Sequence, residues 1–172
     1  AGTRIPPCRA AAVVSDRSVS GDELHRVQRA DGPVIADVHV PPSKSIVNRA
    51  LMCAALADGA SEIRGIAPGD DTAAMITCLQ QLGCGIGIRI DGDDRIADVV
   101  GTGGHLAPGP MTLHAGLAGT TSRFITALSA LGTGAYTIDG HPPLRARPMA
   151  PLHDSLAALG ASVTPGERAG HL

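Results

Sequence analysis

The stretch SKSIVNR at residues 43–49 is the part of the sequence that best indicates the fold. It follows the proline pair Pro41–Pro42, which excludes a helix before it, and it leads into an unbroken apolar run. Ser43 and Ser45 are typical of a helix N-cap and first turn, so the pattern predicts a helix over Ser45–Ala57. Because nearly every side of this helix beyond its first turn is apolar, we expect it to be buried all round.

The first turn of this predicted helix collects groups that bind anions. Lys44 supplies an ammonium group, Arg49 a guanidinium group, and the two serines supply hydroxyl donors. These groups join the free backbone N–H groups and the positive dipole end of a helix N-terminus, which predicts an anion site with phosphate as the leading candidate. The alternative is a capped helix whose Lys and Arg are simply solvated.

The composition suits one ordinary domain and argues against several classes of function. With 172 residues and 44% hydrophobic residues the chain can form a core, while a net charge of −2 gives no basic field for nucleic acid or an anionic membrane. The aromatic residues are Phe124 and Tyr136 alone, so base stacking is not an available binding mode. No apolar run approaches the ~20 residues that span a bilayer, and we expect a cytoplasmic protein with no membrane partner.

The four cysteines are Cys8, Cys53, Cys78 and Cys84, and no C-x-x-C pair occurs. This spacing argues against a zinc site, and we expect no metal. Buried, reduced thiols in a cytosolic protein are the favoured interpretation.

The chain is predicted to consist of a mobile arm, 1–32, and one lobe, 33–172. The arm has many charges and weak periodicity, with at most a short helix near 22–29. The lobe begins with a repeat over about 33–110 that reads strand, helix, strand, helix, strand, strand. Its strands are predicted over 34–40, 61–66, 85–90 and 96–101, and its helices over 45–57 and from an Asp70 or Asp71 cap to about 82.

The same pattern recurs over about 111–172. Here GTTSR opens an apolar helix that ends near 131, followed by a strand over 135–139, a loop, a helix over 149–159 and the start of a strand over 161–164. Arg49 and Arg123 lie 74 residues apart, and a Leu-x-x-Leu-Gly pattern recurs at 79–83 and 156–160. The sequence therefore predicts an α/β (α+β) fold with buried helices and a mixed sheet, built from two βαβαββ repeats of which the second lacks its final strand.

Polar residues cluster at several helix openings, where they could form one site. If the repeats pack side by side, Lys44, Arg49, Arg123 and Arg147 would converge on one rim that suits a doubly anionic ligand or two anions. Gly119 suits a place where the backbone approaches a ligand closely. Each residue also has a plainer interpretation: a turn glycine, or solvated Arg side chains. The Asp70–Asp71 pair could serve acid–base chemistry or cap a helix.

Four stretches of the sequence resemble the 5-enolpyruvylshikimate-3-phosphate synthase family: SKSIVNRALMCAALADG, the DDT helix opening, GLAGTTSRF and RARPMAPLHDSLAALGA. They occur in the family's order and spacing, from about 34 to 164. The resemblance implies one lobe of the enolpyruvyl transferase fold. It also implies transfer of the enolpyruvyl group of phosphoenolpyruvate to the 5-hydroxyl of shikimate 3-phosphate, without a metal or organic cofactor. The related transferase that acts on UDP-N-acetylglucosamine shares the fold but differs around the Lys, and is less favoured.

The resemblance also implies roles for individual residues. Lys44 would contact both substrates, Ser45 and Arg49 would hold shikimate 3-phosphate, and Gly119 and Arg147 would hold phosphoenolpyruvate. Glyphosate would inhibit the complete enzyme. The residues expected to support the phosphoenolpyruvate site or to line the cleft are Asp71, Thr120 and Arg123.

The chain departs from the family pattern at three positions and in length. Pro42 stands where the family usually has Gly, Leu117 where it often has Asn, and Phe124 where Pro is common. Members are more than twice as long, and their second lobe supplies the acid–base residues. We therefore weigh a piece of a synthase that is inactive alone, a non-catalytic anion-binding or interaction domain derived from the fold, and a different enolpyruvyl transferase.

Overall fold

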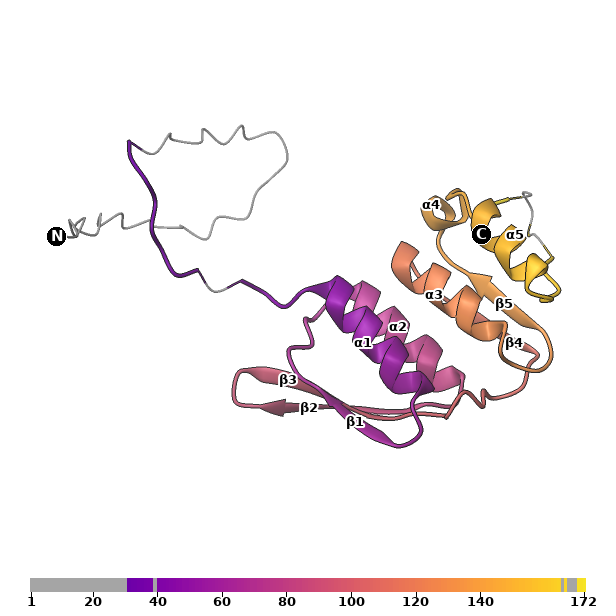
Figure 1. Cartoon of the computed structure of the whole chain (residues 1–172), viewed down its shortest axis with the longest axis horizontal. Helices are drawn as coiled ribbons and strands as arrows, with labels where there is room; N and C mark the ends of the chain where they lie inside the picture. Colours follow the sequence, from indigo (N-terminus) through magenta and orange to yellow (C-terminus); the bar gives the residue numbers. More distant parts are fainter. Residues whose placement is uncertain (1–30, 39, 165, 167–169) are drawn as a thin grey trace. The chain divides into compact units, whose positions relative to one another are not determined.

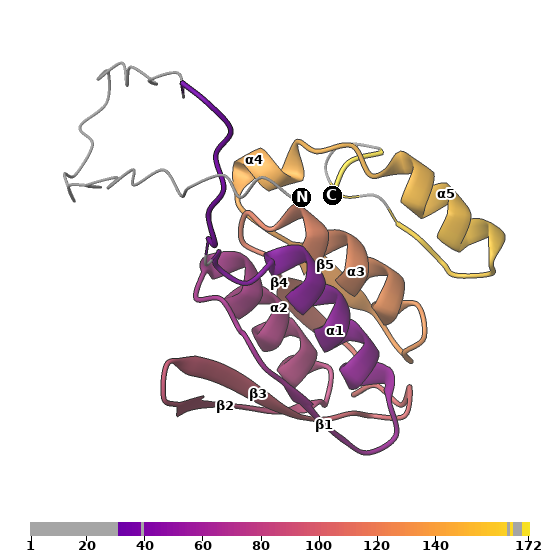
Figure 2. The same ribbon diagram turned by 60° about the vertical axis from the view of Figure 1, so that its left-hand side comes forward.

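Three helices, α1 (Lys44–Leu56), α2 (Asp70–Gln81) and α3 (Gly119–Ser129), lie side by side (Figure 1, Figure 2). The computed structural model describes residues 31–38, 40–164, 166 and 170–172. The chain divides into two units, Ala1–Val40 and Pro41–Leu172, and every helix and strand described here belongs to the second. The short helix predicted near 22–29, and the arm to which it belongs up to residue 30, lie outside the described residues.

A three-stranded antiparallel sheet packs against the first two helices. It contains β1 (Ala60–Ile63), β2 (Gly85–Asp91) and β3 (Asp94–Val100) in the order β1-β3-β2. The turn between β2 and β3 closes on the pair Asp91↔Asp94, with Gly92 at a positive φ of 60°, as the DGDD sequence predicts. The predicted hairpin is therefore confirmed.

A second, two-stranded parallel sheet is formed by β4 (Met111–His114) and β5 (Tyr136–Asp139), which α3 connects as a crossover. The strands are thus divided between one antiparallel and one parallel sheet, and the α+β class is confirmed. Beyond β5 come the short helix α4 (Pro142–Arg145) and then α5 (Ala150–Ala158). Helix α4 lies within the segment predicted to be a loop, because its two prolines suit the first turn of a helix as well as a turn.

The core runs between the helices and both sheets. Fully buried side chains come from α1, α2, α3 and β4, including Leu51, Leu79, Leu113 and Ile125. Helix α1 is not buried all round, because its packing on α2, α3 and the sheet covers only one side. Ile46 is 70% exposed on its other side.

The strand predicted over 34–40 is wrong for the described residues of that segment. Residues 33–38 and 40 are not in a strand, and the side chains of Val34, Ile35, Val38 and Val40 are exposed. A β-strand is stabilised by hydrogen bonds to a neighbouring strand, and no described strand pairs with this segment. Alternation of residue types alone cannot supply that partner.

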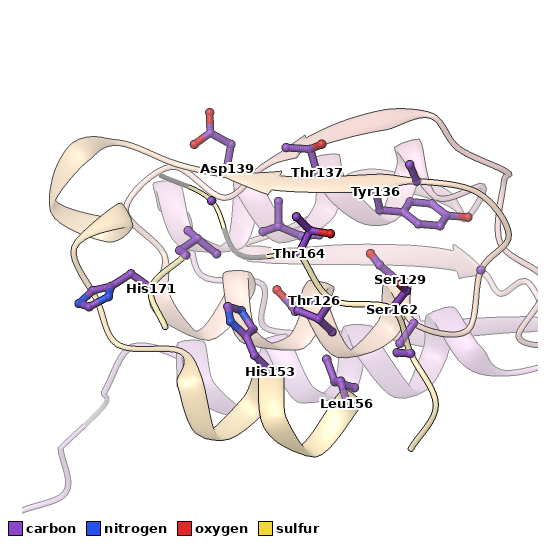
Figure 3. Close-up of a pocket in the computed structure, with 18 of the residues that line it drawn as sticks. Thr126, Ser129, Tyr136, Thr137, Asp139, His153, Leu156, Ser162, Thr164 and His171 are labelled. Carbon is purple, nitrogen blue, oxygen red and sulfur yellow. The ribbon is translucent and has the colours of Figure 1, made fainter. Parts of the chain in front are cut away.

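The strand predicted over 161–164 is also absent. In the first predicted repeat the equivalent strand, β2, pairs with β3, whereas no described strand pairs with residues 161–164. Residues 161–164 instead border a hollow of about 1250 Å³ between α3, β5 and α5, which Figure 3 shows from the side of Thr164. The two-repeat division at about residue 110 stays a prediction, although α1, β1 and α2 recur in order as α3, β5 and α5.

In the part of the chain that the structure describes, no helix is both long and apolar enough to cross a membrane. Two of the three described cysteines, Cys78 and Cys84, are buried free thiols, and burial raises the pKa of Cys78 to about 11. Cys53 is exposed, contrary to the prediction, because it lies on the side of α1 away from the core. Cys8 lies outside the described residues.

Candidate anion-binding site

A small cavity of about 400 Å³ lies where the beginnings of the helices meet. It collects side chains from α1, α2, α3 and the segment before α5, which are far apart in the sequence. Of the four residues predicted to converge, Arg49, Arg123 and Arg147 line this cavity and Lys44 does not. The lining residues are Arg49, Asp71, Leu117, Gly119, Thr120, Arg123, Phe124 and Arg147.

None of the three guanidinium groups of this cavity forms an ion pair with a carboxylate of the described residues. Arg49 donates a hydrogen bond to the carbonyl oxygen of Ser45 (2.8 Å), and Arg123 donates to those of Gly119 and Pro148 (both 3.2 Å). The side chain of Arg147 forms no hydrogen bond or ion pair with any described residue, and only its backbone N–H donates, to the backbone oxygen of Leu144 (3.0 Å). Three positive charges therefore face one carboxylate, that of Asp71, with which none of them forms an ion pair.

The start of α3 forms one wall of the cavity. Gly119 is buried, and a Cβ atom built on it would collide with Nη1 of Arg147, so the missing side chain leaves room for this guanidinium group. The group that lies close to Gly119 in the structure is the Arg147 guanidinium group, and the close approach of a ligand at this position stays a prediction. The hydroxyl group of Thr121 donates to the backbone oxygen of Asp71 (3.2 Å) and joins α3 to the first turn of α2. This contact was not predicted, because a Thr in the first turn of a helix gives no signal of a side-chain contact with another helix.

Lys44 and Ser45 do not line this cavity. Lys44 is exposed at the beginning of α1, and its ammonium group would lie 3.5 Å from a Cβ atom built on Gly69, just before α2. It has no hydrogen bond or ion pair with the described residues, so it remains available at the edge of the cluster. The N-cap residue of α2 is Gly69 rather than an aspartate, and Asp70 and Asp71 lie in the first turn, where the helix dipole favours carboxylates.

Arg145 and Arg147 are close in sequence but differ in environment. Arg145 binds the carboxylate of Asp139 through Nε (2.7 Å) and Nη2 (2.9 Å). These hydrogen bonds, helped by the backbone N–H of Gly140, lower the pKa of Asp139 below its ordinary value. Because of this ion pair the side chain of Arg145 is bound outside the cavity. Of the two arginines, only Arg147 lines the cavity.

The larger hollow beside β5 offers no comparable cluster of charges. Arg145 is its only described lining residue with a permanent positive charge, and Asp139 pairs with it. Figure 3 shows Thr126, Ser129 and Leu156 along one side and Tyr136, Thr137 and Asp139 along the other. We therefore place the candidate site in the smaller cavity. Among the described residues, no group of His, Cys, Asp and Glu side chains is arranged to hold a metal ion.

Comparison with known proteins agrees with the motifs. The family model for EPSP synthase (3-phosphoshikimate 1-carboxyvinyltransferase) matches residues 28–172. The 3-phosphoshikimate 1-carboxyvinyltransferase of Nostoc punctiforme is 43% identical over 131 residues, which are 76% of this chain and 30% of that protein. The protein of the same name from Pseudomonas syringae pv. tomato is 37% identical over 138 residues, 80% of this chain and 32% of that protein.

The structural comparison leads to the same family. An EPSP synthase from Acinetobacter baumannii superposes with a TM-score of 0.64 and 25% identity, covering 78% of this chain and 30% of that chain. This chain thus spans about 30% of the length of the relatives it matches. On the strength of the family match over most of its length, the chain belongs to the EPSP synthase (3-phosphoshikimate 1-carboxyvinyltransferase) family.

Proposed function

We propose that this chain supplies the substrate-anion site of a 3-phosphoshikimate 1-carboxyvinyltransferase. In this proposal it takes part in transferring the enolpyruvyl group of phosphoenolpyruvate to shikimate 3-phosphate. The observation that carries the proposal is the cavity in which Arg49, Arg123 and Arg147 face a single carboxylate. Unpaired guanidinium groups are costly to keep together unless an anion binds between them, and both substrates are multiply charged anions.

The proposal assigns to individual residues the roles that the resemblance to the family implies, and the cavity supports it because most of these residues line it. Arg147 and the start of α3 at Gly119 and Thr120 would hold phosphoenolpyruvate, with Arg123 supporting them. Arg49 would hold shikimate 3-phosphate with Ser45. Lys44, at the edge of the cluster, would reach both substrates once they are bound, and Asp71 would line the cleft between them.

Binding and turnover are separate parts of this proposal. The cavity supplies cations, but its only described carboxylate is Asp71, and no neutral base lines it. Acid–base catalysis requires a group within hydrogen-bonding reach of the proton that moves. We therefore propose that the 172-residue chain binds the two anions and does not by itself catalyse the transfer.

The test compares two neighbouring arginines. Titration calorimetry with phosphoenolpyruvate should show that Arg147→Gln weakens binding by about tenfold or more, since a hydrogen bond to a charged group contributes roughly 1.5–3 kcal/mol. Arg145→Gln is the matched control, because its guanidinium group pairs with Asp139 outside the cavity. Its affinity should stay within about twofold of that of the parent chain, a difference of roughly 0.4 kcal/mol.

Two outcomes would contradict the proposal. If Arg147→Gln and Arg145→Gln had the same affinity, the cavity would not be the anion site. If the parent chain released phosphate from phosphoenolpyruvate and shikimate 3-phosphate, the restriction to binding would be wrong.

A further inference from the structure

The two aromatic residues of this chain have different surroundings. Tyr136 lies in β5, where its hydroxyl group donates to the backbone oxygens of Ala107 (2.8 Å) and Thr133 (3.2 Å) and ties two loops together. Phe124 lies on α3, is half-buried against the core and also forms part of the wall of the anion cavity. Nothing in core packing alone requires an aromatic ring at the edge of a cavity of charges.

The ring of Phe124 lies beneath a guanidinium group from the other repeat. The Cζ atom of Arg49, on α1, lies over this ring at 5.7 Å from its centroid. This distance falls within the range in which the negative face of an aromatic ring attracts a cation. The contact joins α1 to α3 at the anion site.

Arg49 and Arg123, which occupy equivalent positions in the two predicted repeats, form the same type of hydrogen bond with the backbone of their own helix. Arg49 donates from Nη1 to the backbone oxygen of Ser45, four residues earlier, and Arg123 donates from Nη1 to that of Gly119, also four residues earlier. Arg123 has a second anchor, the backbone oxygen of Pro148. Among the described residues Arg49 has no second hydrogen bond, and its second contact is the ring of Phe124.

We propose that Phe124 is a positioning residue, whose ring holds the guanidinium group of Arg49 in place for shikimate 3-phosphate. This inference rests on the function proposed above. A guanidinium group has five N–H donors, and in Arg49 the backbone oxygen of Ser45 uses one of them. The face of a ring uses none, whereas a carboxylate in the same place would occupy two donors and neutralise the charge. The ring therefore fixes the orientation of Arg49 while leaving its charge and remaining donors for the ligand.

The experiment measures the affinity of the 172-residue chain for shikimate 3-phosphate by titration calorimetry. Phe124→Leu keeps an apolar side chain but removes the ring, and it should weaken binding about three- to tenfold. Phe124→Tyr keeps the ring face and should restore the affinity to within about twofold of the parent value. Tyr136→Phe is the control for a loss of stability, because it removes hydrogen bonds far from Arg49, and its affinity should not change.

A double-mutant cycle separates positioning from general packing. If Phe124 acts through Arg49, adding Phe124→Leu to Arg49→Gln should not weaken binding further. A second measurement needs no ligand. The Arg49 Nε–H resonance, identified by its loss in Arg49→Gln, should shift in Phe124→Leu because the ring current is removed, and should stay near its parent position in Phe124→Tyr.

The outcomes distinguish this inference from the function on which it rests. If the parent chain binds shikimate 3-phosphate and Phe124→Leu binds it with the same affinity, the positioning role is wrong and the proposed function still stands. Equal losses from Phe124→Leu in the presence and absence of Arg49 also overturn it. A parent chain that does not bind shikimate 3-phosphate overturns the proposed function itself.

Discussion

At the scale of one residue, Gly119 is a position where a substitution should weaken ligand binding without destabilising the fold. It lies in the first turn of α3, its φ angle is not in the left-handed region, and its buried position faces the Arg147 guanidinium group. A Cβ atom here would collide with the end of a flexible side chain rather than with backbone. The fold can therefore accept alanine at position 119. The guanidinium group of Arg147, however, would have to move out of its present position.

We expect Gly119→Ala to leave the free energy of unfolding within about 0.5 kcal/mol of the parent value, or to raise it by up to about 1 kcal/mol, since alanine is a better helix former. The same change should weaken phosphoenolpyruvate binding several-fold, because Arg147 must move away. Urea denaturation and titration calorimetry on one preparation measure the two effects. Unchanged affinity would mean that Arg147 reaches the ligand from another direction.

Residue types predicted the charged part of the site, but not the contacts that hold it. Arg49, Arg123 and Arg147 could be proposed because helix beginnings rich in Ser, Thr and Gly attract anions. The Arg49–Phe124 contact could not, because it joins residues that approach only after α1 and α3 pack together. Equally, only the Asp139 ion pair shows that Arg145 lies outside the site.

At the scale of the elements, the end of α1 and the loop after β3 depend on a glycine. The backbone N–H groups of Gly101, Thr102 and Gly103 donate to the backbone oxygens of Gly59, Ala55 and Ala57. A Cβ atom on Gly101 would collide with the backbone oxygens of Ala54 and Ala57, and neither can move without disturbing α1. This glycine sets how closely the antiparallel sheet packs on the helix.

Gly101→Ala should therefore destabilise the chain by about 1–3 kcal/mol, the usual cost of overpacking a well-filled interior. Gly87→Ala is the matched control, since Gly87 lies on β2 of the same sheet and has open space where its Cβ would be. That change should alter the free energy of unfolding by less than about 0.5 kcal/mol. Equal effects in chemical denaturation would show that β-propensity, rather than the contact with α1, explains the loss.

Elements with local signals were predictable, whereas those that need distant partners were not. Helices α1, α2, α3 and α5 and the β2–β3 hairpin follow from periodicity, glycines at helix ends and the DGDD turn. The segments 34–40 and 161–164 have strand-like sequences but no paired neighbour in the described chain. A strand is fixed by its partner, and sequence alternation only permits it.

At the scale of the whole molecule, the two predicted repeats share one core. Val47 and Leu51 of α1, Leu79 of α2 and Ile125 of α3 belong to one buried cluster, which Leu113 of β4 completes. The cavity of the anion site lies at the beginnings of the same helices, so neither repeat could form it alone. Repetition in the sequence predicted the order of the elements but not this mutual dependence.

All buried hydrophobic residues of the described chain lie between Val47 and Leu156, and none comes from residues 31–38 or 40. The apolar side chains of Val34, Ile35, Val38 and Val40 are at least three-quarters exposed. We therefore expect these four side chains to contribute little hydrophobic stabilisation. The end of the chain differs, because Met149 and Ala150 at the beginning of α5 donate their N–H groups to the backbone oxygen of Gly170.

A chain that starts at Pro41 should unfold in urea with a free energy within about 0.5 kcal/mol of that of a chain that starts at Asp31. Its dependence on urea should also be little changed, since the same surface is exposed on unfolding. Deleting residues 161–172 is the contrasting variant. It removes an acceptor from two N–H groups at the beginning of α5, and the loss should be about 1–3 kcal/mol if those groups are left without a partner. If removing residues 31–40 cost more than removing residues 161–172, the segment 34–40 would have to contribute to the folded unit, and the division of the chain at Val40 would be wrong.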